Sequence, residues 1–564
     1  MRLRIGEFLT ASTSDQTGSE NMQQRIERVT EDLKCLNKFY NISFSPERVN
    51  RLRAYYNEQL GDLSKEDFDT LPQQDKVDCL LLQNYLQRNI KQLDLDAQRN
   101  KRMQPLLPFA PTIINLCEER QKMKPINGQA AAGDLDHATK TISELKQRIE
   151  TGKMPIDKPS ALRAANAADE LRNHLQEWFG FFNAYDPLFT WWVSEPYGKI
   201  AKELEGLTTL IREKLVGISP GSEEDAIVGE PIGRDGLLAD LEAEMIPYSP
   251  EELLSIGESE YAWCEAEMIK ASTELGYGND WHQALEFVKT LHVEPGQQTQ
   301  LVHDLAREAI DYVTKQHDLV TVPPLAAETW RMVMMPPAQQ KQAPFFLGGE
   351  KIMVSYPTAD MSHESKLMSM RGNNIHFARA TVFHELIPGH HLQMYVNARH
   401  RVYRKLFNTP FWIEGGALYW EMILWDKKFA LTPENKIGML FWRMHRCVRI
   451  IFSLKFHLGL MTPQECVDQL VDRVGHERAT AEGEVRRSFG GDYTPLYQAG
   501  YMLGALQLYA LRKEVVDAGM MMPEKAFHDR ILKENHMPIE LLRVLLKDLP
   551  VRRNFKAQWR FYES

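Results

Sequence analysis

The sequence predicts a mainly α-helical protein with one small β-sheet. Apolar residues recur three and four positions apart, with charged residues between them, most clearly over residues 31–60 and 77–100. From Val322 to Pro357 this pattern stops, and prolines and glycines bound two short β-type runs, Arg331–Met335 and Lys351–Tyr356. We expect these runs to form a small hairpin or edge strands. The chain carries no fixed-period repeat of the kind that builds a solenoid.

The same interruption suggests a division of the chain. We predict a helical N-terminal half over residues 1–320 and a second half, residues 321–564, that carries the small sheet and the candidate site. Within the first half, residues 219–236 are rich in glycine, proline and acidic side chains and are predicted to form an exposed loop.

Composition indicates a globular protein and argues against several functional classes. The chain has 564 residues, of which 43% are hydrophobic and 26% charged, so it can bury a large core. A net charge of -10 gives no basic surface for nucleic acid. The N-terminal residues lack a signal-peptide core and no apolar run is long enough for a membrane span, so we expect a cytoplasmic protein without a membrane partner. The oligomeric state is not indicated.

The six cysteines do not suggest a metal site. They are scattered along the chain, and no two form a CxxC pair, so no thiolate zinc site can be written from their spacing.

The segment ATVFHELIPGHHLQMY holds the strongest chemical signal. His384 and Glu385 begin it as in the HExxH helix of metallopeptidases, where two histidines bind zinc and the glutamate is the general base. The next histidines, His390 and His391, follow six and seven positions after His384, so the usual spacing of four does not apply.

Pro388 and Gly389 explain how the longer spacing can work. Proline lacks the N–H that would bond to the carbonyl of His384, and glycine adopts backbone angles closed to other residues. We therefore expect the helix to open or bulge after His384, which can bring a later histidine back towards it. His390 is the first choice for the second ligand, and His391 is the alternative.

A third ligand is expected from the segment FWIEGGALYWEMILWD. Glu414 and Glu421 are seven residues apart, on one face of a predicted helix, among apolar and aromatic residues. Unpaired carboxylates are costly in such surroundings. A zinc ion bound to one of them and a ligand histidine bound to the other would satisfy both.

These segments resemble a bacterial family known as domain of unknown function 885, which is placed among gluzincin-like metallopeptidases. HELIPGHHLQ is similar to its HExxPGHHxQ signature and EGGALYWE to its EGWALYxE segment. Two later segments, RCVRIIFSLKFHLGLMTPQECVDQL and EVRRSFGGDYTPLYQAGYMLGAL, also resemble family motifs, so the likeness covers roughly residues 359–513. More distantly, the arrangement is similar to thimet-oligopeptidase-like enzymes.

The resemblance implies a large helical metallopeptidase-like fold, with a substrate channel between two helical halves. It implies one Zn²⁺ ion, which would be held by the residues that match the family's ligands: His384, His390 and Glu414. Glu385 would then be the general base and Glu421 a partner of a ligand histidine. Tyr501 would donate a hydrogen bond to the developing oxyanion, with Tyr497 as its alternative because the interval before Tyr501 is one residue shorter than in the family.

Two departures from the family pattern concern tryptophans. Gly416 and Met461 stand where the family usually has tryptophan. We expect Gly416 to widen a pocket or to remove a substrate contact.

Four further residues are candidates for substrate binding. Arg446 and Arg449 lie on an otherwise apolar helix, and His457 follows on the same helix. The arginines are predicted either to clamp a substrate carboxylate or to form a structural pair with Glu484 or another acid. The run that ends at Tyr356 is predicted either to align an extended substrate or to be an ordinary structural strand.

These residues favour a zinc metallopeptidase that acts on peptides through a metal-activated water. The same groups would serve a zinc hydrolase of non-peptide amides or esters. A third hypothesis is a helical binding protein with a vestigial metal site.

Overall fold

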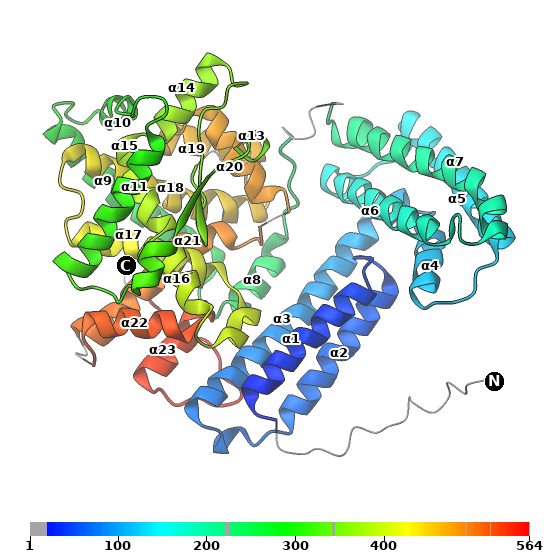
Figure 1. The fold of residues 1–564 in the computed structure, drawn as a ribbon, viewed down its shortest axis with the longest axis horizontal. Helices are drawn as coiled ribbons and strands as arrows, with labels where there is room; N and C mark the ends of the chain where they lie inside the picture. The colour runs from blue at the N-terminus through cyan, green and yellow to red at the C-terminus, as the bar shows by residue number, and fades with distance from the viewer. Residues whose placement is uncertain are drawn as a thin grey trace.

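The computed structural model describes residues 20–219, 221, 226–340, 345–491, 493–518 and 521–562. Helices dominate these residues, and the only named strands among them form a two-stranded sheet (Figure 1). The predicted mainly α fold with a small sheet is therefore confirmed.

Side-chain caps fix where many of the helices begin. Asn21 and Ser249 each accept a hydrogen bond from the third residue of the helix that follows, and the side chain at that third residue bonds back to the cap. Ser45 caps in the same way without the return bond, and Pro46 follows it at the first helical position, where a missing N–H costs nothing.

The first seven helices form two groups. α1 (Met22–Phe39), α2 (Pro46–Ser64) and α3 (Gln73–Met103) run side by side (Figure 1). Four further helices form a lobe with its own apolar core, at the right of Figure 1: α4 (Ala110–Gln121), α5 (Gly128–Glu150), α6 (Lys158–Phe182) and α7 (Pro187–Ile211).

The remaining helices build the larger part of the molecule. Before the candidate site they are α8 (Gly233–Ala243), α9 (Pro250–Glu274), α10 (Trp281–Lys289), α11 (Gln298–Asp311), α12 (Pro324–Thr329), α13 (Pro337–Gln340) and α14 (His363–Gly372). From the site onwards they are α15 (Ile375–Glu385), α16 (His390–Asn397), α17 (Pro410–Asp426), α18 (Pro433–His457), α19 (Pro463–Val474), α20 (Arg478–Phe489), α21 (Tyr497–Arg512), α22 (Glu524–Glu534) and α23 (Ile539–Lys547).

The largest apolar core crosses residue 320, where the sequence placed the boundary between halves. α9 packs along α18, and α11 packs against α15, so helices from before that residue cover the helices that carry the candidate site. The helices α1–α3 also contribute side chains to this core.

The sheet differs from the expected hairpin. β1 (Arg331–Met334) and β2 (Lys351–Val354) are parallel, with Arg331 opposite Lys351. Parallel strands cannot be joined by a tight turn, and the connection between them contains α13. A separate antiparallel bridge joins Leu347 to Met353 and brings the end of that connection beside β2.

The expected loop over residues 219–236 lies partly outside the described residues. The described part runs without regular structure from residue 226 to α8, which begins at Gly233.

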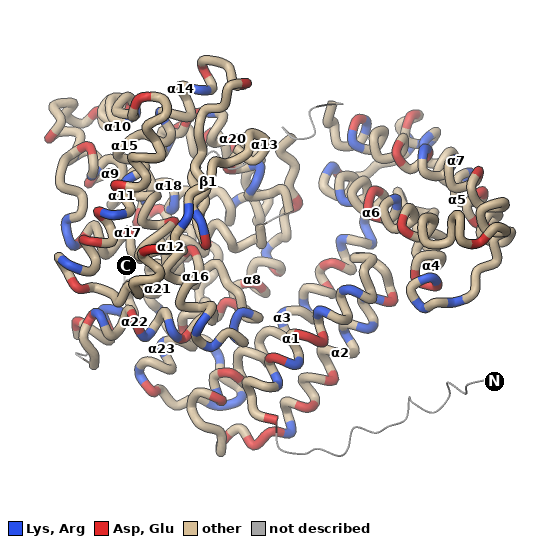
Figure 2. Tube along the Cα trace, in the orientation of Figure 1, with Lys and Arg blue, Asp and Glu red and all other residues tan. Residues whose placement is uncertain are grey.

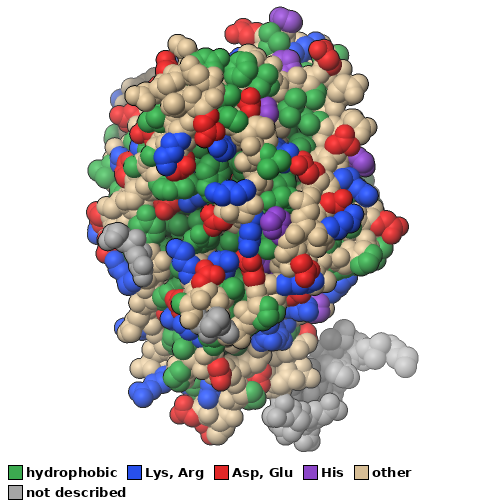
Figure 3. All heavy atoms as spheres, turned by 90° about the vertical axis from the view of Figure 1, so that its left-hand side faces the viewer, with side chains coloured by type: hydrophobic (Ala, Val, Ile, Leu, Met, Phe, Trp, Pro, Cys, Tyr) green, Lys and Arg blue, Asp and Glu red, His purple; other side chains and the backbone are tan. Residues whose placement is uncertain are grey.

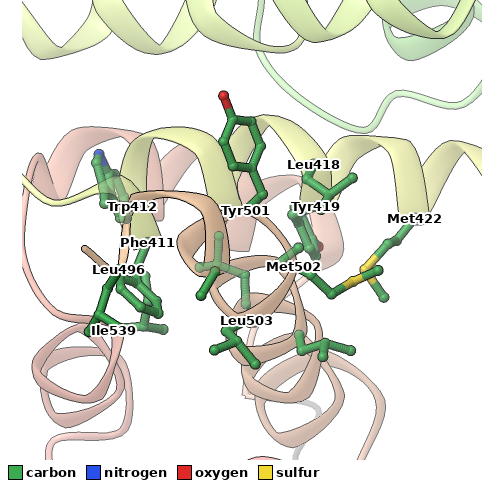
Figure 4. Close-up of a cluster of buried hydrophobic side chains, with 14 of the residues drawn as sticks. Phe411, Trp412, Leu418, Tyr419, Met422, Leu496, Tyr501, Met502, Leu503 and Ile539 are labelled. Atoms are coloured by element: carbon green, nitrogen blue, oxygen red, sulfur yellow. The ribbon is translucent and has the colours of Figure 1, made fainter. Parts of the chain in front are cut away.

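Close packing of α17 on α21 positions one wall of the candidate site. A Cβ on Gly415 would lie 2.6 Å from the Cα of Gly504, and a Cβ on Gly504 would lie 2.2 Å from the carbonyl oxygen of Phe411. Side chains from both helices form an apolar cluster beside this contact, and Tyr501 points out of it (Figure 4). The glycines thus let Glu414 on α17 face the tyrosines of α21.

Charges of both signs are mixed on the described parts of the molecule. Basic and acidic residues are interspersed along the described trace (Figure 2), and both signs lie among apolar side chains on the face in Figure 3. Among the described residues, no helix is both long and apolar enough to cross a bilayer.

Candidate metal centre

The predicted opening of the helix after His384 is confirmed. α15 ends at Glu385, and α16 begins at His390. A Cβ on Gly389 would lie 1.9 Å from the carbonyl oxygen of His384, so only glycine fits there. This close approach folds the chain back and leaves the His384 and His390 rings 4.9 Å apart, nearly at right angles.

Three buried side chains converge beside this break. His384, His390 and Glu414 each offer a ligand atom, and these atoms lie within 4.8 Å of one another. The Nε2 atoms of His390 and His384 lie 3.2 and 3.8 Å from the same carboxylate oxygen of Glu414. The exposed fractions are 1% for His384, 7% for His390 and 6% for Glu414. The three residues form a possible metal-binding triad.

The contact of Glu421 with His384 favours a cation between the three ligand residues. Its carboxylate lies 2.7 Å from Nδ1 of His384, so Nδ1 donates its proton there. In a neutral ring, Nε2 would then present its lone pair to the Glu414 oxygen, and two electron-rich atoms would face each other. A metal ion between them would remove this repulsion. Two imidazoles and one carboxylate, with a second carboxylate behind one imidazole, are a common donor set for catalytic zinc.

The pKa shifts point to the same need for positive charge. Burial lowers the pKa of His384, but the hydrogen bonds to Glu414 and Glu421 outweigh it and raise the pKa to about 9. Burial raises the pKa of Glu414, but His390 and His384 hold it well below its usual range. These charges therefore favour a positive charge at the centre of the cluster, of the kind that a proton or a metal ion supplies.

The ring of His391 lies outside the triad. Its Nδ1 atom lies 3.0 Å from the carbonyl oxygen of Gly349, and its Nε2 atom lies 3.1 Å from that of Ala326. Both ring nitrogens therefore face backbone carbonyls. His391 ties the start of α16 to the segment before β2 and to α12.

The backbone of Gly348 packs directly against Glu385. A Cβ at residue 348 would lie 2.4 Å from both the carbonyl oxygen and the Oε2 atom of Glu385. Any larger residue would displace the carboxylate. Burial raises the pKa of Glu385, which suits a general base near neutral pH.

Tyr497 and Tyr501 lie one turn apart on α21, and both reach the site. The hydroxyl of Tyr497 donates a short hydrogen bond to Oε1 of Glu414, the carboxylate oxygen that faces away from the histidines. The Tyr501 and His384 rings are inclined by 15° to each other, and their centres lie 6.3 Å apart. Burial and the charge of Glu414 raise the pKa of Tyr501 well above 10, despite Arg449 and Arg487, so its hydroxyl stays protonated.

Arg446 and Arg449 lie behind this tyrosine. Their guanidinium groups lie 4.9 and 4.3 Å from the ring centre of Tyr501, and both residues are almost fully buried. Arg446 approaches Glu421 at 3.6 Å, and Arg449 binds Glu484 at 2.6 Å. The structure thus contains the Glu484 pair that the sequence offered as one alternative.

Two of the candidate substrate-binding residues are not brought to the triad. His457 packs beside Phe456 and Phe489, and burial together with the positive charge of Arg99 on α3 lowers its pKa to about 3. The ring is therefore neutral. The backbone N–H of Tyr356 donates to Gln340.

Gly416 does not open a large pocket. A Cβ on this residue would lie 2.7 Å from Nε2 of Gln393, so that side chain lies over the glycine. Gln393 in turn donates to the carbonyl of Trp412. The adjoining cavity has a volume of about 20 Å³, room for about one water molecule.

Sequence reasoning missed Gly348, Tyr493 and Arg487 as parts of this site. Tyr493 stacks on Tyr497 with ring centres 3.9 Å apart, and Arg487 lies 5.5 Å from the Tyr493 ring. The available signal was the three-residue spacing of Glu484 and Arg487, which puts an arginine one turn from a buried acid on α20.

Comparisons with known proteins give a family and a fold. The model of a family described as "Bacterial protein of unknown function (DUF885)" matches residues 41–546. A putative lipoprotein of unknown function from Shewanella oneidensis is similar in structure, with a TM-score of 0.65 and 17% identity, covering 93% of this chain and 100% of that one. A putative lipoprotein from Colwellia psychrerythraea has a TM-score of 0.59 and 16% identity, covering 94% of this chain and 99% of that one. No curated protein matches.

Proposed function

We propose that this chain, which belongs to the bacterial DUF885 family, is a zinc-dependent hydrolase that cleaves peptide bonds. One observation carries the proposal. The ligand atoms of His384, His390 and Glu414 lie within 4.8 Å of one another. Glu385 directly follows His384 in the sequence, and its carboxylate is not part of that triad. This combination gives three protein ligands and a separate base, the arrangement used by hydrolytic zinc sites.

The triad would hold one Zn²⁺ ion. When bound, zinc would polarise a substrate carbonyl and lower the pKa of a water molecule towards neutrality. Glu421 keeps the His384 ring oriented through Nδ1, and Tyr497 fixes the Glu414 carboxylate through Oε1.

Glu385 and Tyr501 supply the remaining chemistry. Glu385 takes a proton from the attacking water and passes it to the leaving nitrogen. Tyr501 keeps its proton, because the pKa of its hydroxyl is well above 10, and can donate a hydrogen bond to the oxygen on which negative charge develops. Tyr497 is committed to Glu414, which favours Tyr501 over Tyr497 for that role.

Metal analysis and chelation test this function. Protein purified without chelator should contain one zinc ion per chain and hydrolyse members of a peptide library. Removal of the metal should abolish hydrolysis, and stoichiometric zinc should restore it. Hydrolysis of small acyl-amides or esters but of no peptide would favour the non-peptide hydrolase. Absence of stoichiometric metal would favour a binding protein with a vestigial site.

We also propose that the chain is exported, in place of the cytoplasmic location expected from its N-terminal residues. The description of both similar structures as putative lipoproteins supports this proposal. Fractionation of native cells should find the protein with the envelope. Its recovery in the cytosolic fraction alone would contradict export and leave the hydrolase proposal standing.

A further inference from the structure

A wall of tyrosines and arginines extends from the metal triad towards the end of α20. Tyr497 bonds to Glu414 and stacks on Tyr493, with the two rings parallel to within 1°. The Arg487 guanidinium lies over the Tyr493 ring, and the Arg449 guanidinium lies over the Tyr501 ring. The stacked rings of Tyr493 and Tyr497 lie between the Arg487 guanidinium and the triad. A few residues of extended peptide would span that distance.

Among the residues that the structure describes, the two arginines of this wall, Arg449 and Arg487, approach the same carboxylate. Arg449 approaches Oε1 of Glu484 at 2.6 Å, and Arg487 approaches Oε2 of the same carboxylate at 2.8 Å. Glu484 is fully buried and also accepts from Gln498. Within this described trio, one carboxylate is therefore shared by two guanidinium groups, an excess of one positive charge.

Buried hydrogen-bond donors in the same wall also lack partners. Among the described residues, Nη1 of Arg449 and Nε of Arg487 are buried and have no acceptor. Arg449 is 1% exposed. Within the same described part of the chain, Oε2 of Glu484 is also without a hydrogen-bond partner, although it lies 2.8 Å from Arg487. Unpaired charged donors at this depth are costly, and an anion supplied from outside would pair with them.

Arg487 is the more exposed of the two arginines. Its side chain keeps 12% exposure, whereas that of Arg449 keeps 1%. Arg446 is a weaker candidate, because it lies behind Tyr501 and already approaches Glu421. An anion from solvent would therefore contact Arg487 before Arg449, and the positive charge of the buried Arg449 would add to the attraction.

We propose that Arg487, supported by Arg449 and Tyr493, binds a carboxylate of the substrate, so that the hydrolase acts near the free C-terminus of peptides. The inference rests on the proposed function. A carboxylate suits this place because a guanidinium offers it a planar pair of donors. The same chemistry is offered by an acidic side chain within the peptide, and the substrates of the test separate the two sources.

The test uses matched peptides and the zinc-loaded full chain. One pair differs only in a free or amidated C-terminus, and a second, amidated pair differs only in Glu or Gln near the cleaved bond. We expect the free C-terminus to raise kcat/KM by about 100-fold, and Arg487→Gln to remove that preference mainly through KM. Cleavage of the amidated peptide should fall much less than cleavage of the free peptide, and Arg487→Lys should restore part of the preference.

Controls keep the result specific. Arg478→Gln removes an exposed arginine from the same helix and should leave both rates unchanged. Zinc content and thermal melting show whether Arg487→Gln remains folded. Equal cleavage of free and amidated peptides by the unsubstituted chain would overturn the inference. So would a preference for the acidic side chain alone, or equal loss on both peptides in a folded Arg487→Gln variant.

A binding measurement separates this inference from the hydrolase proposal. Calorimetric titration of the zinc-loaded Glu385→Gln chain, which should not cleave them, with the free and amidated peptides should show about 100-fold tighter binding of the free form, lost when Arg487→Gln is added. Failure of the hydrolase proposal would appear as no cleavage of any peptide, with this binding difference intact. Binding that ignores the C-terminal group would overturn the carboxylate site itself.

Discussion

Replacing Glu385 with glutamine is expected to lower kcat by about 10³-fold or more while zinc remains bound. Glutamine has the same shape but cannot accept the proton of the attacking water. Glu385 is not in the triad, so the ligand atoms of His384, His390 and Glu414 remain in place. Initial rates on the best peptide give kcat, and mass spectrometry gives the zinc content of each chain.

A second glutamate provides the control for this experiment. Glu364 lies exposed in the first turn of α14, and Glu364→Gln makes the same chemical change away from the site. It should leave both activity and zinc content unchanged. Full activity in the Glu385→Gln variant would remove this residue as the base. Loss of zinc together with activity would instead indicate that Glu385 helps to hold the metal.

The parts of the site that were predictable depend on local sequence. Pro388 and Gly389 interrupt a helix through their own backbone properties, so the break between α15 and α16 could be anticipated. The seven-residue spacing of Glu414 and Glu421 places both on one face of α17 by helix geometry alone. Each inference needs only residues that are neighbours along the chain.

The parts that were missed depend on contacts between distant segments. Gly348 meets Glu385 because the connection before β2 folds onto the end of α15, and no nearby residue indicates that contact. The parallel pairing of β1 with β2 likewise depends on the path of the chain between them. Tyr493 joins the site by stacking on Tyr497 of α21, and Arg487 of α20 joins it by lying over the Tyr493 ring.

The choice between the paired histidines shows the same limit. Adjacent residues of a helix point about 100° apart, so only one of His390 and His391 can face His384. The sequence does not fix which, because the answer depends on how far the chain turns at Gly389. In the structure His390 faces Glu414, whereas His391 faces the carbonyls of Ala326 and Gly349.

Alanine substitution of the two histidines should therefore have opposite effects on metal binding. His390→Ala removes a ligand atom and is expected to weaken zinc binding by more than about 100-fold, because even partners of ligand residues are worth 10–100-fold. His391→Ala leaves the triad intact and should retain stoichiometric zinc. It removes a buried ring that donates to a backbone carbonyl and is expected to destabilise the fold by about 1–3 kcal/mol.

Competition with a chromophoric chelator measures zinc affinity, and urea unfolding of the zinc-loaded chains measures stability. His390→Ala should bind zinc weakly and hydrolyse no peptide, whereas His391→Ala should unfold at lower urea yet keep its metal. Zinc retained in the first variant and lost in the second would move the ligand role to His391. That result would also require α16 to turn by about 100° in the metal-bound protein, which would withdraw His391 from the carbonyl of Gly349 and free the segment that packs on Glu385. The two variants therefore test the ligand assignment and the support of the catalytic base together.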